Sequence, residues 1–410
     1  MKKTLLSVGL LALAINAKAQ FLSSVGDGAV MHIGKNALMY NGGGLQIKSG
    51  GFVENHGNVM LVGSGSDFFK TLNASGNDKT EAEAVAKVGG QFVNVLNEPA
   101  GYAGKNNTAS GDVFTYGQLY ITGFPQSNLT GYVNQEHRNV NHGDFQQMAL
   151  PFYDKTLSTL STDLGKTFST VRWSKNEILK YNNPLVVFDH YTSLATKLSD
   201  PTGYYILGNN NNTLNVSTVT RTVVGRPYAD GNQLIISLQN AGNGINWNGG
   251  GAINGYNEKY NTYVQDGFEM AMGGKAWEGN FGRNMYQFGN PFLTNIDLRN
   301  IFINEGASGD GVYLTNIYGI RVEQAAGTVS YQQNVGGGAS AARYITWDTV
   351  NNIPVGDVNW LIVRPMSVFT IKLKDNATAQ TLDFNNLRSC LLYTSPSPRD
   401  VEESRMPSSA

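Results

Sequence analysis

Four carboxylates in one aromatic-rich stretch are the residues best suited to chemistry. They are Glu258, Asp266, Glu269 and Glu278. Glycoside hydrolysis uses two such groups on either side of the scissile bond, roughly 5 to 9.5 Å apart. One function class consistent with this stretch is therefore a polysaccharide-acting enzyme or the carbohydrate-binding accessory module of one.

The spacing of these groups and their aromatic neighbours favour binding over hydrolysis. Asp266 precedes Gly267 and fits a solvated turn, and in one strand Asp266 and Glu269 would point to opposite faces. Aromatic rings offer flat apolar faces on which sugars can stack. We therefore predict no catalytic residue and a ligand-binding surface made of Trp247, Tyr256, Tyr260, Tyr263 and Trp277.

Metal ligands are concentrated in the segment Glu136–Asp144, which contains His137 and His142. A zinc site needs three or four ligands in a defined geometry, and this spacing matches no strong zinc motif. We predict no metal site there and interpret the two histidines as surface residues of a polar loop. Calcium is the ion that the loop oxygens would favour, through asparagine carbonyls and Asp27, Asp230 and Asp310.

Other reaction classes lack their characteristic residues. The only cysteine is Cys390, and neither a G-x-S-x-G elbow nor a P-loop is present. With 30 basic and 31 acidic residues, the formal net charge of −1 provides no electrostatic footprint for nucleic acid or an anionic membrane. We predict no cofactor, no nucleic-acid partner and no disulfide framework.

The first residues have the pattern of a secretory signal peptide, residues 1–19. A basic start precedes the apolar run Thr4–Ile15, which is too short to span a bilayer. Small residues follow at Ala17 and Ala19, so we predict cleavage between Ala19 and Gln20. The expected protein is exported to the outer-membrane surface or the medium and has no transmembrane segment.

The last residues, 389–410, have a different character. Cys390–Asp400 resembles the translation of a transposase-end sequencing adapter, and Ser404–Ala410 resembles a flow-cell segment read in the same frame. Between them Val401–Glu403 leaves the room of a short index. We therefore expect this tail to be non-native and to pack against nothing.

Glycine and asparagine content indicates a chain of strands and turns. The sequence has 48 glycines among 410 residues, well above the usual frequency of about 7%. Neither residue favours a helix interior, and both supply the positive φ of tight turns. The predicted fold class is all-β, with short solenoid-like or meander repeats followed by a β-sandwich of jelly-roll type.

Three regions follow from the pattern along the mature chain. Residues 20–65 contain short apolar stretches closed by glycine, the pattern of a small β-solenoid or a meander. Residues 66–111 are interpreted as a linker with a solvated helical insert at Thr80–Lys87. Residues 112–388 carry regular strand signals and are assigned to the sandwich.

Three local features of the sandwich region are also expected. Phe145–Phe152 and Tyr286–Phe292 each read as a strand that stops at a proline and turns a corner. Pro365 divides the final apolar run into two strands or places it at a sheet edge. One helical interlude is expected over Thr156–Lys180.

Some of these residues resemble a known group of proteins. Gly289–Asp297, with the letters GNPFLTNID, is similar to a corner of β-sandwich modules in secreted Bacteroidota proteins exported by the type IX system. Pro365–Lys372 and Thr381–Arg388 resemble the strand pair that closes those modules. The resemblance implies export by the type IX machinery and a sorting domain after the module, and it says little of activity because such modules serve many proteins.

Three function classes remain open from the sequence. The first is a non-enzymatic, adhesin-like surface protein that binds a glycan or a neighbouring cell surface through weak multivalent contacts. The second is the polysaccharide-acting enzyme or accessory module considered above. The third is a purely structural surface module, which the sequence does not separate from the first.

Overall fold

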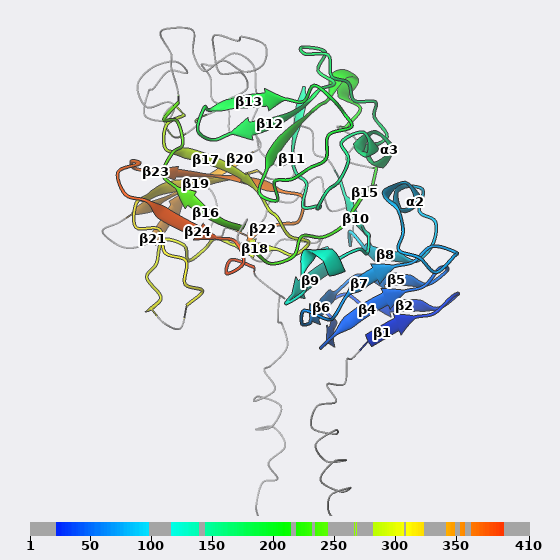
Figure 1. Cartoon of the computed structure of the whole chain (residues 1–410). Helices are drawn as coiled ribbons and strands as arrows, with labels where there is room; N and C mark the ends of the chain where they lie inside the picture. The colour runs from blue at the N-terminus through cyan, green and yellow to red at the C-terminus, as the bar shows by residue number, and fades with distance from the viewer. Residues whose placement is uncertain are drawn as a thin grey trace, which may run out of the picture.

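The computed structural model has an all-β fold, which confirms the predicted class (Figure 1). It describes residues 22–97, 116–138, 144–214, 219–231, 234–244, 266, 268, 282–306, 309–323, 342–348, 353–356 and 362–388. Its named helical elements are short: α2 (Glu81–Val85), α3 (Thr159–Leu164) and two 3₁₀ turns at Gln126–Asn128 and Asn210–Asn212.

The amino-terminal part is a β-solenoid with three faces, in which each turn of the chain, or rung, adds one strand to each face. The first rung comprises β1 (Leu22–Val25), β2 (Val30–Ile33) and β3 (Leu38–Asn41). The second comprises β4 (Gly44–Ile47), β5 (Phe52–Asn55) and β6 (Asn58–Val62). The third comprises β7 (Phe69–Thr71), β8 (Gln91–Asn94) and β9 (Gln118–Thr122). Because all pairings between rungs are parallel, the solenoid alternative is the correct one and the meander is not.

Glycines at the corners allow the rungs to stack closely. A Cβ added at Gly57 would lie 2.4 Å from the carbonyl oxygen of Gly34 in the rung before it. At Gly117, in the following rung, it would lie 1.9 Å from the carbonyl oxygen of Asn55. Only a residue without a side chain permits such close backbone approach, so glycine is a packing requirement at Gly57 and Gly117, whereas a Cβ at Gly34 would meet nothing within 4 Å.

A ladder of buried amides runs along one inner corner of the solenoid. Asn55 donates from Nδ2 to Oδ1 of Asn94 in the next rung at 2.8 Å, and Asn94 donates to Oε1 of Gln135 at 3.0 Å. All three side chains are fully buried. A second bond from Asn55 Nδ2 reaches the carbonyl of Gln118 at 2.9 Å. Satisfied buried amides hold the register of the rungs, because a slip by one residue would leave several of them without partners.

Replacing the middle amide of this ladder should destabilise the whole molecule. In Asn94→Ala, the Asn55 donor and the Gln135 acceptor lose their partner, and each unsatisfied buried group costs about 1–3 kcal/mol. We expect the free energy of unfolding in urea to fall by about 2–4 kcal/mol, with a change below about 0.5 kcal/mol for exposed Asn77→Ala. Equal effects of the two substitutions would contradict a register role for the ladder.

The solenoid extends well beyond residue 65. The interpretation of residues 66–111 as a linker is therefore wrong. Strands β7 and β8 lie inside residues 66–111 and form part of the third rung. The helix α2 forms close to its predicted position, with a capping box between Thr80 and Glu83. It is docked rather than solvated, because Glu81 accepts hydrogen bonds from the backbone and hydroxyl of Thr156 at 2.9 and 2.6 Å.

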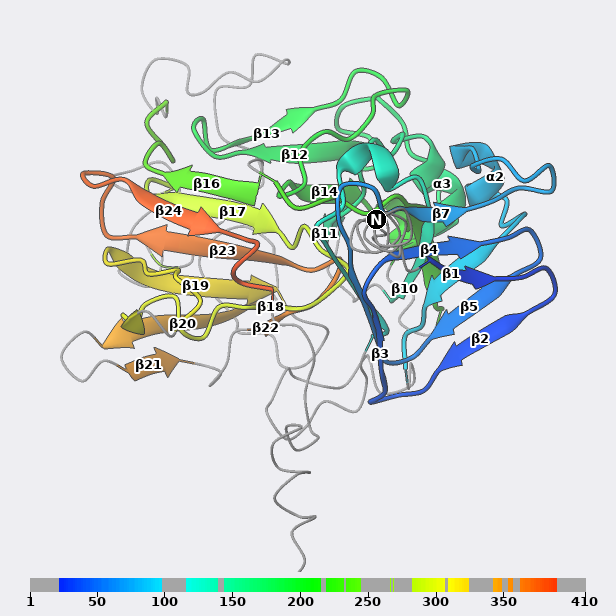
Figure 2. The ribbon, with the colours of Figure 1, turned by 60° about the horizontal axis from the view of Figure 1, so that its bottom comes forward.

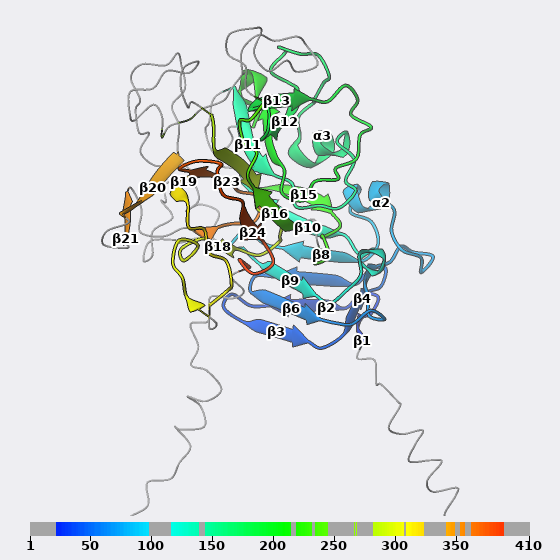
Figure 3. The same ribbon diagram turned by 60° about the vertical axis from the view of Figure 1, so that its left-hand side comes forward.

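Two strands beyond the third rung close the upper end of the solenoid. Strand β10 (Val133–His137) pairs with β8 in parallel, and β15 (Arg221–Gly225) then pairs with β10 in antiparallel orientation. Figures 1 and 3 show β10 and β15 on the side toward the rest of the molecule and β1 at the opposite end. The sandwich region predicted to begin at residue 112 therefore begins with solenoid strands.

The remaining strands form stacked antiparallel sheets. One sheet has the order β11 (Phe145–Ala149), β14 (Tyr204–Gly208), β12 (Ile178–Asn182) and β13 (Val187–His190). The other has the order β17 (Met285–Gly289), β23 (Val368–Leu373), β19 (Ile317–Glu323), β20 (Ala342–Asp348) and β21 (Ile353–Gly356). Two strand pairs complete the fold, β16 (Ile235–Leu238) with β24 (Gln380–Asp383) and β18 (Ile296–Asp297) with β22 (Ile362–Val363).

The five-stranded sheet is a middle layer with both faces covered. Along β23, Val368 packs into the core shared with the four-stranded sheet, whereas Phe369 and Ile371 pack into the core beneath β16 and β24. This alternation places successive side chains on opposite faces. The second face of the four-stranded sheet packs into the core that continues into the solenoid. The solenoid, the four-stranded sheet and the five-stranded sheet therefore form one body (Figure 2).

Both proline corners occur where the sequence predicted them. Strand β11 ends before Pro151 and β17 ends before Pro291, and both prolines line one small cavity at the junction with the solenoid. Pro365 likewise separates β22 from β23. The helical interlude is shorter than expected, because only Thr159–Leu164 is helical and Ile178 already lies in β12.

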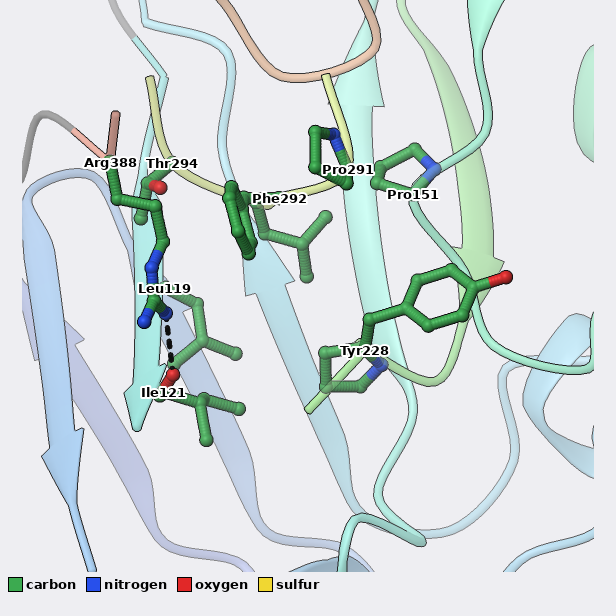
Figure 4. A pocket seen from close by; sticks show the side chains of 10 residues that line it. Leu119, Ile121, Pro151, Tyr228, Pro291, Phe292, Thr294 and Arg388 are labelled. Carbon is green, nitrogen blue, oxygen red and sulfur yellow. Dashed lines mark hydrogen bonds between the residues drawn. The ribbon is translucent and has the colours of Figure 1, made fainter. Parts of the chain in front are cut away.

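Arg388, which follows the last strand β24, links the sandwich to the solenoid (Figure 4). Its guanidinium donates to the carbonyl oxygen of Ile121 in β9 at 2.7 Å and pairs with Asp230 at 2.7 Å. The same cation lies over the rings of Tyr120 and Phe292, at 4.2 and 4.7 Å from their centroids. One buried cation thus joins three segments that are far apart in the sequence.

Removing this cation should loosen the junction between solenoid and sandwich. Arg388→Met keeps the stem but loses the ion pair, the carbonyl bond and both cation–π contacts, for an expected loss of about 2–4 kcal/mol in the free energy of unfolding. The exposed pair of Arg299 with Asp297 provides the control, since Arg299→Met should cost less than about 1 kcal/mol. Urea denaturation measures both, and equal losses would refute the junction role.

Candidate functional site

The chain between β16 and β17 carries the aromatic residues singled out above, and its two ends meet on the sandwich. The backbone N–H of Asn284 donates to the carbonyl of Ala241 at 3.1 Å. Ala241 also donates to the hydroxyl of Tyr286 at 3.3 Å and accepts from the side-chain amide of Asn376 at 2.8 Å. We call the segment 245–281 the aromatic insertion and the residues that hold its ends the insertion base.

The turn between β12 and β13 supports one side of the insertion base. The backbone N–H groups of Gly242 and Gly244 donate to the carbonyls of Asn183 and Pro184, each at 3.0 Å. Gly242 has a φ of 77°, and a Cβ there would lie 2.7 Å from Cα of Arg283. The chain just before the insertion is therefore held by backbone bonds and by Gly242, which no other residue replaces without strain.

A buried ion pair fixes the insertion at a second point. The carboxylate of Asp266 is fully buried and lies 2.7 Å from Nζ of Lys372 on β23. It also accepts from the N–H of Gly282 at 2.8 Å, while Nζ of Lys372 donates to the carbonyl of Arg283 at 2.6 Å. The solvated turn expected at Asp266 is wrong, because this residue anchors the insertion inside the protein.

The remaining predicted residues of this segment lie outside the described residues. These are the five aromatic side chains of the predicted binding surface and three of the four carboxylates, namely Trp247, Tyr256, Tyr260, Tyr263, Trp277, Glu258, Glu269 and Glu278. The signal cleavage residues Ala19 and Gln20 and the tail after Arg388 also lie outside them. These predictions stay predictions.

A row of polar side chains lies between the two sheets beside the insertion base. Gln287, Thr370 and Arg321 are neighbours across β17, β23 and β19. The guanidinium of Arg321 is buried and donates to the hydroxyl of Tyr204 at 3.4 Å and to Oε1 of Gln287 at 3.3 Å. Burial among these groups raises the pKa of Tyr181 well above its ordinary value. The row ties the facing sheets together through a cation whose hydrogen bonds stay inside the protein.

A second cluster of chemically capable residues lies on the outer face of the solenoid. His32 on β2 and Glu54 on β5 are direct register partners, and Nδ1 of His32 lies 3.2 Å from Oε2 of Glu54. Nε2 of His56 lies 3.1 Å from the other carboxylate oxygen. Hydrogen bonds from His56 and His32 lower the pKa of Glu54 and keep the carboxylate charged. Among the described residues, this trio is the one group of three whose ligand atoms converge, all within 4.8 Å.

Sequence reasoning missed this cluster because its members come from different rungs. The signal was present in the two apolar stretches AVMHIG and FVENHG, which place His32 opposite Glu54 once the rungs are stacked. In the segment Glu136–Asp144, where no metal site was predicted, the interpretation of His137 as a surface residue of a polar loop is wrong, and His142 lies outside the described residues. His137 is buried in β10, Glu136 accepts from the N–H of Leu96 at 3.0 Å, and Asp144 pairs with Lys175.

The carboxylates proposed for calcium are separated and have other partners. Asp230 belongs to the Arg388 junction, and Asp310 accepts from the N–H of Val312 at 2.8 Å. Partial burial raises the pKa of Asp310. Asp27 lies in the turn after β1. The three aspartates do not form a common site.

Comparison with protein-family models, curated proteins and solved structures finds no match to this chain. Across the described ranges, no helix has the length and apolar character needed to span a bilayer. The geometry of the insertion base and of the solenoid cluster is therefore what a function must be argued from.

The Asp266–Lys372 pair should respond to substitution as a buried anchor does. Asp266→Asn leaves the Lys372 ammonium without its counter-charge, and we expect the free energy of unfolding to fall by about 3–5 kcal/mol. The double variant Asp266→Asn/Lys372→Met should regain most of this loss, because the uncompensated charge is gone. Lys197→Met, at an exposed pair, should change stability by less than about 1 kcal/mol in the same urea titration. A double variant no more stable than Asp266→Asn would count against this role.

Proposed function

We propose that the protein is an exported, non-enzymatic β-protein, secreted or held at the outer-membrane surface, which binds a glycan or a neighbouring cell surface in the manner of an adhesin. The predicted contact surface is the aromatic insertion, with Trp247, Tyr256, Tyr260, Tyr263 and Trp277. The observation that carries the proposal is the insertion base, which joins a tyrosine- and tryptophan-rich segment to a rigid sandwich at several fixed points.

Binding loops are commonly built in this way. Connections longer than about 15 residues within a compact domain are usually functional or unstructured, and recognition loops depend on a scaffold that fixes their ends. Here the ends meet at Ala241 and Asn284, and Asp266 is held between them. Fixing the ends and the middle lowers the entropy that is lost when a ligand is bound.

The aromatic composition of the insertion supports a carbohydrate ligand. Sugar rings present flat C–H faces that pack on aromatic rings, and tyrosine and tryptophan also offer a hydrogen-bond donor. A few such contacts give modest affinity for one site. Many copies on a cell surface would compensate for this through multivalent attachment.

Catalysis by the carboxylates of this region is the weaker proposal. Asp266 is committed to Lys372 and to the Gly282 amide, so it is not free to give or take a proton in a glycosidase pair. An enzyme would have to use Glu258, Glu269 or Glu278 without it. The anchored base accounts for Asp266 without any catalytic role.

Export is supported by the sequence alone. The segment before Gln20 has the three parts of a signal peptide. The corner Gly289–Asp297 resembles modules exported by the type IX machinery, which makes that machinery the proposed transport partner. In the structure this corner is organised by buried Asn290, whose amide donates to the carbonyls of Thr294 and Val363 at 2.8 and 3.0 Å.

A glycan array tests the binding proposal. Purified Gln20–Ser389 should bind at least one polysaccharide class, and Trp247→Ala or Trp277→Ala should weaken binding at least tenfold, the equivalent of about 1.4 kcal/mol. Trp173→Ala removes an exposed tryptophan on the loop between α3 and β12 and should leave binding unchanged.

The same samples separate binding from hydrolysis. A binding protein leaves the polysaccharide chain length unaltered after prolonged incubation, whereas an enzyme releases reducing ends. Absence of any ligand on the array, or equal binding by the three tryptophan variants, would rule out the aromatic insertion as the contact surface.

A further inference from the structure

Three side chains on the outer face of the solenoid converge as metal ligands do. His32 and Glu54 face each other across β2 and β5, and His56 follows two residues after Glu54 on the same face. Each carboxylate oxygen of Glu54 faces one histidine nitrogen, at 3.2 Å for His32 and 3.1 Å for His56. Ligand atoms bound to tetrahedral zinc at 2.0–2.1 Å lie about 3.4 Å from one another, so small side-chain adjustments suffice.

Asn97, just beyond β8, sets the orientation of one of these ligands. Its side-chain Nδ2 donates to the carbonyl oxygen of His56 at 2.8 Å, which directs Oδ1 toward Nδ1 of the same histidine at 2.7 Å. That oxygen accepts the proton of Nδ1. With Nδ1 bonded in this way, Nε2 is the ring nitrogen that faces Glu54 and is placed to contact a metal ion. Metal-binding histidines are held by such outer partners in the same way.

This arrangement favours a cation among the three residues. Nε2 of His56 and Nδ1 of His32 lie 3.1 and 3.2 Å from the two oxygens of one carboxylate, and a negative charge flanked by two imidazole nitrogens attracts a divalent cation. The rings of His32 and His56 also lie 4.9 Å apart, so both nitrogens can reach one centre. Two imidazoles and one carboxylate are ligands that zinc and its neighbours in the first transition row accept.

We propose that His32, Glu54 and His56 bind one divalent transition-metal ion of the zinc class, with Asn97 as a positioning residue. The proposal does not rest on glycan binding by the aromatic insertion, whose ends are held on the sandwich. The side chains are 56%, 38% and 24% exposed respectively. Three protein ligands on an open surface leave at least one coordination position for water or for a donor group of a bound molecule.

Isothermal titration with Zn²⁺ alone tests the proposal on the full chain at neutral pH. Every sample carries Cys390→Ser so that the single thiol contributes no ligand. We expect one zinc ion per chain at this site, at least tenfold weaker binding in Glu54→Gln and His56→Ala, and a 10- to 100-fold loss in Asn97→Ala. His190→Ala removes a histidine from β13 and serves as the matched control with unchanged affinity.

Thermal unfolding keeps the test decisive if a variant folds poorly. Zinc should raise the Tm of the parent chain and of His190→Ala, whereas Glu54→Gln should show no zinc-dependent shift. Titration with Co²⁺ should give visible absorption bands that disappear in His56→Ala. The proposal is overturned if the parent chain takes up no zinc, or if Glu54→Gln and His56→Ala bind it as the parent does. Either result would make the cluster an ion pair between Glu54 and protonated histidines.

Discussion

Register between successive rungs is the constraint on which the rest of the structure depends. Parallel strands have no hairpin to fix their pairing, so the side chains inside the solenoid must do it. The amides of Asn55, Asn94 and Gln135 do so, because their hydrogen bonds run from rung to rung in a dry corner. The same stacking places His32 beside Glu54 on the outside. The buried amide ladder and the His32–Glu54 contact therefore both follow from the register between the rungs.

The sandwich depends on that alignment through the core that it shares with the solenoid and through a buried cation. A continuous set of apolar side chains passes from the solenoid into the four-stranded sheet and α3. Arg388 then links the end of the sandwich to β9 and to Asp230. A buried cation of this kind is favourable only where its hydrogen bonds and counter-charge are already in place. The aromatic insertion in turn depends on the sandwich, because its buried Asp266 pairs with Lys372 on β23, the strand between β17 and β19.

Much of the fold could be predicted because it follows from local rules. The glycine that closes each apolar stretch indicates stacked β-repeats, and backbone contacts at Gly57 show why no side chain fits there. Pro365 predicts a break in the final apolar run, and Pro151 and Pro291 mark the ends of their strands. The boundary at residue 65 was wrong, because insertions between β7 and β8 hide the third rung from inspection of repeat lengths.

The candidate sites depended on contacts that no local pattern encodes. By itself the sequence determined the all-β class, the glycine corners, the proline-terminated strands and the aromatic character of the insertion, since each follows from neighbouring residues and backbone sterics. Tertiary structure alone decided that Asp266 pairs with Lys372 and that His32, Glu54 and His56 converge. Residues such as Asp266 and Lys372 meet through pairings between distant strands, and those pairings are set by packing of the whole molecule.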